Sequence, residues 1–407
     1  MAYRNKIALV YLLGFALDLL NMFAAAIAYP DISQQLQASV SQLGWVGNAY
    51  MLGLTLVIIP GVWLAAVFGE KRLIMASLLL FSLASWGVAQ AGSIEALIGW
   101  RLLQGLGGGL LIPVGQAMVY RHFPVRERAR LTSVILLVAL LVPALSPTLG
   151  GRIVEAWSWR WVFYANLPLA LLALLLAGCW LKSESPPTPR PTLNYHSLAT
   201  GARSKGGLLK SPLLRVAMLT YLFIPGIFIG TQLVSILYFH QSGLSPAQTG
   251  ALMLPWALAS ALGISLSRYQ FNHLGPKPLL LLGMTAQAAG IALLIQVDAS
   301  STWQTMALYG LMGFGGSLCS STAQNTAFID VSAQRMGHAS ALWNINRQLS
   351  FLLGPALMMG LFAALTALTS TPHAFALCFA IGAALTLLPL FAVLRLNTPR
   401  VLALLAP

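Results

Sequence analysis

Long apolar runs recur along the whole chain and restrict it to one kind of fold. Each run is about twenty residues or longer, the length that a helix needs to cross roughly 30 Å of hydrocarbon. Backbone in hydrocarbon has no water to bond, so these runs must fold as helices. The predicted spans are 7–29, 42–66, 73–91, 95–119, 131–153, 161–181, 213–239, 247–268, 278–297, 303–327, 338–365 and 374–396. We therefore predict an all-α polytopic membrane protein with twelve transmembrane helices.

The scarcity of charged residues supports a lipid-facing surface. The chain has 407 residues, of which 58% are hydrophobic and 8% are charged. Soluble domains carry about 25% charged residues, so this chain has too few charges to cover a soluble surface. The formal net charge of +14 could indicate nucleic-acid binding. However, the basic residues lie in short loops between apolar runs and form no stripe. We expect the lipid bilayer as a partner and no nucleic acid.

The distribution of lysine and arginine predicts the orientation, because cytoplasmic loops are enriched in both residues. One set of alternate loops, with the two ends of the chain, holds Arg4, Lys6, Lys71, Arg72, Arg121, Arg126, Arg128, Arg130, Lys182, Arg190, Arg203, Lys205, Lys210, Arg215, Lys277, Arg335, Arg395 and Arg400. The other set holds mostly Asp31, Glu95, Glu155 and Asp298, with Arg152 and Arg160 as exceptions. We expect both termini to be cytoplasmic and the protein to be a multi-pass protein of a plasma membrane, the inner membrane of a bacterium.

A proline-rich basic stretch divides the chain. Residues 182–212 contain Pro186, Pro187, Pro189 and Pro191, which break helices, so this stretch is predicted to be a cytoplasmic linker. It separates a six-helix bundle at 1–181 from a second at 213–407. An internal repeat supports this division. Gly105, Gly107, Gly108 and Gln116 recur 208 residues later as Gly313, Gly315, Gly316 and Gln324, and Pro147 recurs as Pro355.

Asp18 is the residue with the strongest functional indication. It lies near the midpoint of the predicted helix 7–29, with apolar neighbours on both sides. A carboxylate at that depth costs about 2.5–3.5 kcal/mol on insertion scales, and such residues usually serve a function. Burial disfavours the charged form and a nearby cation favours it, so the group could bind and release a proton. The alternative is an acid that only hydrogen-bonds neighbouring helices.

Further polar residues lie inside the predicted helices. Arg101 is the expected partner of Asp18 in proton coupling, although near the start of helix 95–119 it could instead snorkel to the interface. Arg347 lies in an unusual polar cluster with Asn344, Asn346 and Gln348. This cluster could contact the substrate or hold helices together. The candidate cavity residues are Gln104, Gln116, Asn344, Arg347, Gln324 and Tyr50.

Small residues and prolines form a predicted packing and gating set. Gly105 and Gly107 would allow close approach of helix backbones. Pro147, Gly150 and Gly151 would bend or thin the helix 131–153, and Gly69 lies between two spans. The sequence has no metal-ligand spacing and no grouping of a nucleophile with a base. We expect no metal, no cofactor and no enzymatic activity.

Several motifs together resemble the major facilitator superfamily, specifically its drug:proton antiporter branch. The stretch 101–107 resembles the signature R-x-x-Q-G-x-G, and 146–151 is similar to the antiporter motif G-P-x-x-G-G, with Ser146 in place of its first glycine. Leu17 and Asp18, with Asn21 and Pro30, resemble the L-D…N…P segment of that branch, with a longer spacing to the proline. The stretches 158–168 and 344–349 resemble the motifs S-W-R-W-x-F-x-x-N-x-P and N-x-x-R-Q-L of a subgroup that usually has fourteen helices.

The resemblance covers nearly the whole chain. It implies the major facilitator fold, with two pseudo-symmetric six-helix bundles, and a role for Arg101 in proton coupling. The chain departs from the cytoplasmic gate motif of the family, G-x-x-x-D-R-x-G-R-K/R. The acidic position of that motif falls on Ala66 and the arginine that follows on Val67. The charge lock of the family is therefore not expected in its usual form.

These observations predict a proton-coupled secondary transporter that works by alternating access. The first hypothesis is an exporter, by antiport, of a small organic molecule such as a drug or a metabolite. An uptake symporter of the same fold is the second hypothesis. A membrane sensor or assembly protein without transport is the third. The expected partners are protons and a small-molecule substrate, and a monomer is expected. With one acid against two arginines in the spans, an anionic or zwitterionic substrate fits as well as a cationic one.

Overall fold

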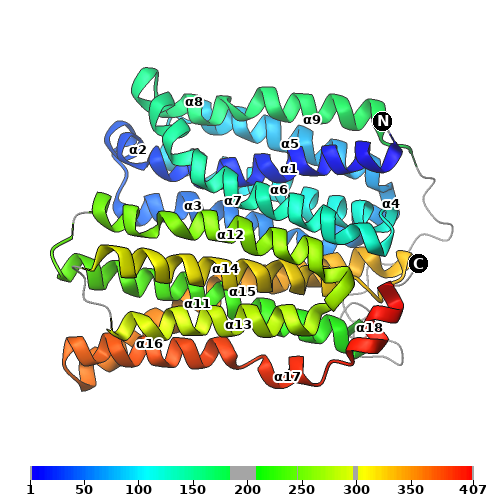
Figure 1. The fold of residues 1–407 in the computed structure, drawn as a ribbon. Coiled ribbons are helices and arrows are strands. Elements are labelled where there is room, and N and C mark those ends of the chain that lie inside the picture. The colour runs from blue at the N-terminus through cyan, green and yellow to red at the C-terminus, as the bar shows by residue number, and fades with distance from the viewer. Residues whose placement is uncertain (1, 184–207, 245, 297–300, 406–407) are drawn as a thin grey trace. The chain divides into compact units, whose positions relative to one another are not determined.

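The computed structural model describes residues 2–183, 208–244, 246–296 and 301–405, and every regular element in these ranges is a helix. The prediction of an all-α polytopic protein is therefore confirmed. Figure 1 shows long helices lying side by side in bundles. The predicted linker 182–212 falls largely on residues 184–207, outside the described ranges, so the boundary between the two predicted bundles stays a prediction.

The chain divides into two compact units. Unit 1 consists of Met1–Phe123, Val138–Leu198 and Ser332–Ile345, and unit 2 of Pro124–Leu137, Ala199–Val331 and Asn346–Pro407. The first part of the chain forms α1 (Tyr3–Ile27), α2 (Tyr29–Leu36), α3 (Val40–Leu56), α4 (Ile58–Phe68), α5 (Glu70–Gln90), α6 (Ile94–His122), α7 (Val125–Ala156), α8 (Trp159–Tyr164) and α9 (Asn166–Trp180).

The second part of the chain forms a similar series. Its elements are η1 (Leu208–Lys210), α11 (Pro212–Gln241), α12 (Pro246–Leu274), α13 (Pro276–Leu293), η2 (Leu294–Gln296), α14 (Thr302–Ala327), η3 (Ala333–Arg335), α15 (Met336–Leu368), α16 (Thr371–Leu387), α17 (Leu390–Leu394) and α18 (Thr398–Leu405). By the division into units, α7 and α15 each begin in one unit and end in the other.

The described helices match the twelve predicted spans in number and order. Nine segments are long and apolar enough to cross a membrane, and the bent pair α3 and α4 makes a tenth. Helices α7 and α14, with 32 and 26 residues, are long enough but do not reach the same apolar threshold within the described residues. Helix α14 is less apolar because it contacts α11, α12 and α13, so much of its surface meets protein rather than lipid.

Three predicted spans are each divided into two helices. The span 42–66 is broken between α3 and α4, the span 161–181 between α8 and α9, and the span 374–396 between α16 and α17. Pro60 and Pro168 follow the first two breaks by three residues, and Pro389 lies within the third. Proline cannot donate its backbone nitrogen to the carbonyl one turn earlier, so a helix ends before it and a new one begins.

Rows of exposed leucine mark the lipid-facing side. On α12, Leu254, Leu258 and Leu262 lie at four-residue intervals and are 67%, 77% and 66% exposed. A four-residue interval places side chains on one face of a helix. Leucine in such a row would be unfavourable in water, so this face is suited to hydrocarbon.

A glycine stripe sets the spacing of helices in each unit. In unit 1, a Cβ on Gly105 would collide with the carbonyl oxygen of Tyr50 in α3, and a Cβ on Gly107 would lie 2.8 Å from the backbone nitrogen of Phe81 in α5. In unit 2, the equivalent atom on Gly313 would lie 2.5 Å from the carbonyl oxygen of Trp256 in α12. Helices α6 and α14 therefore meet their neighbours backbone to backbone, which only glycine permits.

Candidate functional site

Asp18 lies on α1 inside unit 1, and its side chain is 4% exposed. The hydroxyl of Tyr50, from α3, donates a hydrogen bond to the Oδ1 of Asp18. Gly108 of α6 makes room for this pair, since a Cβ there would lie 3.2 Å from that oxygen and 3.0 Å from the hydroxyl. Three helices thus enclose the carboxyl group.

Arg101 lies over the face of the Tyr50 ring. Its Cζ is 4.4 Å from the ring centroid, a cation–π distance, and its guanidinium lies near enough to Asp18 for an electrostatic interaction. Its Nε donates to the carbonyl oxygen of Val46 at 3.1 Å, and its Nη1 donates to Oε1 of Gln104 at 2.8 Å. The side chain is 1% exposed, which is not the geometry of a snorkelling residue.

Gln104 extends the polar network to α5. Its Nε2 donates to Oγ of Ser85 at 2.7 Å, and that hydroxyl donates to the carbonyl oxygen of Phe81 at 2.8 Å. Gln104 and Ser85 are both fully buried. The network therefore joins α1, α3, α6 and α5 through Asp18, Tyr50, Arg101, Gln104 and Ser85. A buried chain of this kind is stable only when its members bond one another.

A pair of asparagines lies one turn from the acid. Asn166, at the start of α9, donates through Nδ2 to Oδ1 of Asn21 at 3.1 Å. Asn21 is 1% exposed, and its side chain also interacts with the Tyr50 hydroxyl. The two asparagines therefore extend the polar network from Tyr50 to α9.

Two further candidates meet elsewhere in unit 1. Asn344, at the start of α15, donates through Nδ2 to Oε1 of Gln116 on α6 at 2.8 Å. It also donates to the carbonyl oxygen of Ser340 at 2.8 Å. Both amide side chains are 2% exposed.

The other two polar candidates lie in unit 2. Arg347 lies on α15 close enough to Tyr221 of α11 for an electrostatic interaction. Its neighbour Asn346 donates to the carbonyl oxygen of Met218 at 2.9 Å, which ties α15 to α11. Gln324 is 4% exposed near the end of α14. The predicted polar residues are thus divided between the units, with Asp18, Tyr50, Arg101, Gln104, Gln116 and Asn344 in unit 1 and Arg347 and Gln324 in unit 2.

The departure from the family's gate motif is partly compensated by a different acid. Glu70, at the start of α5, accepts two hydrogen bonds from Arg121 at the end of α6, at 2.9 and 3.1 Å. Nε of Arg121 also donates to the carbonyl oxygen of Ala333 at 3.2 Å. Ala333 leads into α15 and belongs to unit 1. The gate motif places its carboxylate at the position of Ala66. In this chain the carboxylate is Glu70, four residues later.

The remaining packing candidates lie at helix surfaces and ends. Gly69 joins α4 to α5 with a φ of 84°, a conformation that favours glycine. Gly150 is buried in α7, whereas a Cβ on Gly151 would meet open space. Pro147 also lies in α7, but its side chain is outside the described part of the structure.

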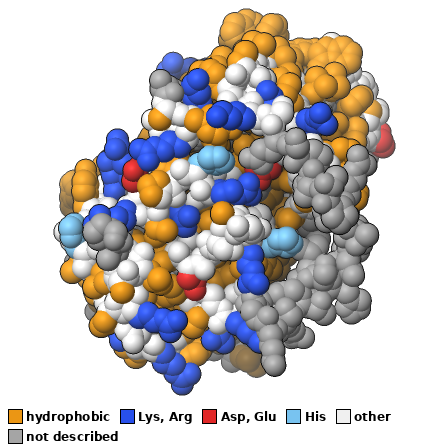
Figure 2. Space-filling view, turned by 90° about the vertical axis from the view of Figure 1, so that its right-hand side faces the viewer, with side chains coloured by type: hydrophobic (Ala, Val, Ile, Leu, Met, Phe, Trp, Pro, Cys, Tyr) orange, Lys and Arg blue, Asp and Glu red, His pale blue; other side chains and the backbone are white. Residues whose placement is uncertain are grey.

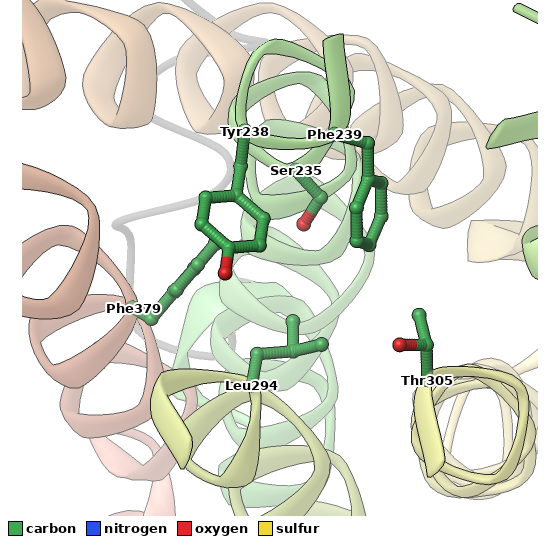
Figure 3. Close-up of a pocket in the computed structure, with 6 residues that line it drawn as sticks. All are labelled: Ser235, Tyr238, Phe239, Leu294, Thr305 and Phe379. Atoms are coloured by element: carbon green, nitrogen blue, oxygen red, sulfur yellow. The ribbon is translucent and has the colours of Figure 1, made fainter. Parts of the chain in front are cut away.

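A small cavity in unit 2 involves none of the predicted residues. Figure 3 shows its lining, which comes from α11, η2, α14 and α16 and consists of Ser235, Tyr238, Phe239, Leu294, Thr305 and Phe379. It is too narrow to hold a water molecule. We therefore treat it as a packing defect and not as a binding site.

Three members of the site are not among the residues that the sequence predicts. Ser85 bonds Gln104, Asn166 bonds Asn21, and Glu70 bonds Arg121. Ser85 is one of several serines in α5, and its spacing from Ser77 and Ser82 gives no distinctive signal. Asn166 belongs to the stretch 158–168, whose resemblance to a family motif assigns it no role. Glu70 gave no indication, because its partner is 51 residues away.

The bundle of apolar helices and the buried polar network define a polytopic membrane protein of the transporter class. The chain belongs to the Major Facilitator Superfamily, whose sequence profile matches residues 11–355. The multidrug resistance protein Stp of Mycobacterium tuberculosis (strain CDC 1551 / Oshkosh) is 26% identical, over 91% of this chain and 78% of Stp.

Two solved structures share the fold. The human organic anion transporter MFSD10 superposes with a TM-score of 0.75 at 18% identity, over 97% of this chain and 100% of MFSD10. The proton:xylose symporter XylE superposes with a TM-score of 0.72 at 17% identity, over 95% of this chain and 94% of XylE. At these identities the likeness establishes the fold alone.

Proposed function

We propose that this transporter exports a small organic molecule in exchange for protons. The observation that carries the proposal is the buried Asp18, bonded by Tyr50 and close to Arg101. A carboxyl group that can be neutral or charged, beside a fixed cation, can trade a proton for another interaction as its surroundings change. Asp18 and Arg101 are the proton-coupling residues in this proposal.

The direction of transport is proposed from relatives. Stp and other relatives are named multidrug resistance proteins, and a protein named multidrug export protein EmrB, from Escherichia coli (strain K12), matches 45% of this chain at 29% identity. The resemblance of 101–107 and 146–151 to antiporter motifs supports the same direction. Alternating access between the predicted bundles 1–181 and 213–407 would carry the substrate, with Gln104, Gln116, Asn344, Arg347, Gln324 and Tyr50 as proposed cavity residues.

The test uses the purified chain in proteoliposomes that carry a pH gradient, acid inside. Ethidium, norfloxacin and salicylate serve as a cationic, a zwitterionic and an anionic probe, and internal pyranine reports pH. Antiport should accumulate at least one probe inside while the lumen becomes more alkaline. Symport would instead drive preloaded probe outwards with protons. If no probe moves protons in either direction, the transport proposal fails in favour of a sensor or assembly role.

Asp18→Asn removes the titratable group while keeping the shape of the side chain. Because the amide cannot exchange a proton, gradient-driven accumulation should be lost, whereas exchange of labelled probe for unlabelled probe without a gradient should persist. Asp31→Asn is the matched control, since Asp31 lies outside the site, in α2, and should leave accumulation unchanged. Wild-type accumulation by Asp18→Asn would remove Asp18 from the coupling mechanism.

A further inference from the structure

A groove of about 280 Å³ lies on unit 2 where the start of α11 meets α17. Its walls are apolar, formed by Val216 and Leu219 of α11 with Phe391 and Leu396. Arg215 and Arg395 also line it, one from each side of the groove. The groove thus combines two guanidinium groups with an apolar floor.

No described residue neutralises the two arginines. Both are exposed, and neither guanidinium makes a hydrogen bond or an ion pair with another described residue. Lys277 adds a third positive charge, since its Nζ donates at 2.7 Å to the carbonyl oxygen of Leu394, the residue before Arg395. Asp330 accepts a hydrogen bond from Ser211 at 2.7 Å and forms no ion pair with Arg215.

The apolar wall faces the lipid side of the helix ends. Phe391 is 55% exposed, and the nearby Leu388 and Leu394 are 46% and 52% exposed. Figure 2 shows the end of the molecule at which α18 lies, where lysine and arginine side chains are spread widely and acidic ones are few. A site at this level has hydrocarbon on one side and a positively charged surface on the other.

We propose that the groove binds one anionic phospholipid. The phosphate group lies between Arg215 and Arg395, because guanidinium groups bind phosphate oxygens with paired, charge-assisted hydrogen bonds. The first part of an acyl chain lies along Leu219 and Phe391. Basic pockets between membrane helices are suited to acidic headgroups. A soluble phosphate would use the arginines alone and would leave the apolar wall uncovered, so the groove matches a lipid better than a free anion.

The experiment is native mass spectrometry of the full chain released from detergent micelles. Phosphatidylglycerol is titrated as the probe, with phosphatidylcholine as the neutral lipid and inorganic phosphate as the free anion. The wild type should retain one phosphatidylglycerol more tightly than the rest, with no equivalent for phosphatidylcholine. The double variant Arg215→Gln/Arg395→Gln should bind this molecule about 30-fold more weakly, or about 2 kcal/mol, since each basic group near an anionic lipid contributes about half of that.

A second variant tests the apolar half without changing charge. Ala392 lines the same groove, and Ala392→Trp should fill it and displace the lipid while both arginines remain. The control Arg126→Gln/Arg130→Gln removes two exposed arginines of unit 2 outside the groove and should keep the tight lipid. Wild-type retention by both groove variants would overturn the proposal, as would equal loss in the control. Displacement of the lipid by millimolar phosphate would show a free-anion site instead.

Discussion

The side chain of Tyr50 contacts two charged residues. Its hydroxyl donates to Asp18, and its ring faces Arg101. The phenol gives the acid a hydrogen-bond donor and the base an aromatic face, and both contacts can persist when Asp18 is protonated. The phenol is therefore the residue most able to keep the site folded through a change of charge.

Variants at Tyr50 can separate its two contacts. Tyr50→Phe removes the donor to Asp18 and keeps the ring over Arg101, whereas Tyr50→Leu removes both. We expect the leucine variant to be less stable than the phenylalanine variant by about 0.5–2 kcal/mol, the range of a cation–π contact. Thermal unfolding of the detergent-solubilised variants measures the difference. Equal stability of the two variants would show that the ring does not support Arg101.

Gln104 gives a second prediction at the same scale. Gln104→Leu leaves Nη1 of Arg101 without its acceptor and Oγ of Ser85 without its donor. Removing the partner of a buried polar group costs about 1–3 kcal/mol, so the variant should unfold at a lower temperature. Gln90→Leu is the control, because Gln90 is exposed and bonds only the hydroxyl of Tyr164. A control as damaging as Gln104→Leu would contradict the network.

Much of this residue-scale site follows from the sequence, but not all of it. A charged residue inside an apolar run stands out in the sequence, so Asp18 and Arg101 could be predicted as site residues. Ser85 and Asn166 could not, because serine and asparagine are common in membrane helices and become informative only when a partner lies opposite. The predicted bundles 1–181 and 213–407 already separate Arg347 and Gln324 from Asp18, whereas the placement of Asn344 in the unit of Asp18 depends on packing that no local pattern encodes.

At the scale of elements, α6 and α14 have matching roles in the two units. Helix α6 packs against α1, α3, α4 and α5, and α14 packs against α11, α12 and α13. Each does so through a glycine stripe. The sequence repeat at an offset of 208 residues predicted this correspondence. The breaks at Pro60, Pro168 and Pro389 were not predicted, because proline is often tolerated inside membrane helices and composition alone does not distinguish a bend from a break.

The glycine stripes can be tested with matched substitutions. Gly105→Ala and Gly313→Ala place a Cβ against backbone atoms, so each should destabilise its unit by about 1–3 kcal/mol through overpacking. Gly99→Ala and Gly310→Ala lie on the same two helices with open or loose surroundings. These controls should be neutral, or stabilising by up to about 1 kcal/mol through helix propensity. Chemical denaturation in mild detergent compares the four, and equal effects within a pair would contradict the stripe.

The ion pair of Glu70 and Arg121 holds three segments together. It links α5 to α6, and Arg121 also bonds the segment before α15. The two side chains are 12% and 25% exposed, so solvent screens them only in part. A double-mutant cycle with Glu70→Gln and Arg121→Gln should give a coupling energy of about 1–2 kcal/mol. Glu155→Gln, at an exposed glutamate, should change stability by less than about 0.5 kcal/mol. A coupling energy near zero would mean that the pair does not hold the segment.

At the scale of the whole molecule, the positive-inside pattern predicts the sidedness of every loop. A green fluorescent protein fused after Pro407 should fluoresce, because it folds in the cytoplasm, and alkaline phosphatase at the same position should be inactive. Alkaline phosphatase inserted after Glu155 should be active, because this loop is predicted to lie outside. The opposite result at both positions would invert the topology and, with it, the predicted cytoplasmic position of the lipid groove.

The fold could be predicted from the sequence because hydrocarbon leaves so few solutions. Apolar runs of sufficient length must be helices, and their number fixes the class. The same argument does not give function. XylE is named a proton:xylose symporter and shares the fold with this chain, so architecture alone does not distinguish import from export.

Helices α7 and α15 are continuous backbones that pass from one unit into the other, after Leu137 and after Ile345. If the units rotate during transport, α7 and α15 must bend or twist, because each is one continuous helix. Pro143 follows the first crossing by six residues and Pro355 follows the second by ten. Each proline removes one rung of the helical ladder and lowers the resistance to flexing. Both described helices that pass between the units thus contain a proline at which they can bend.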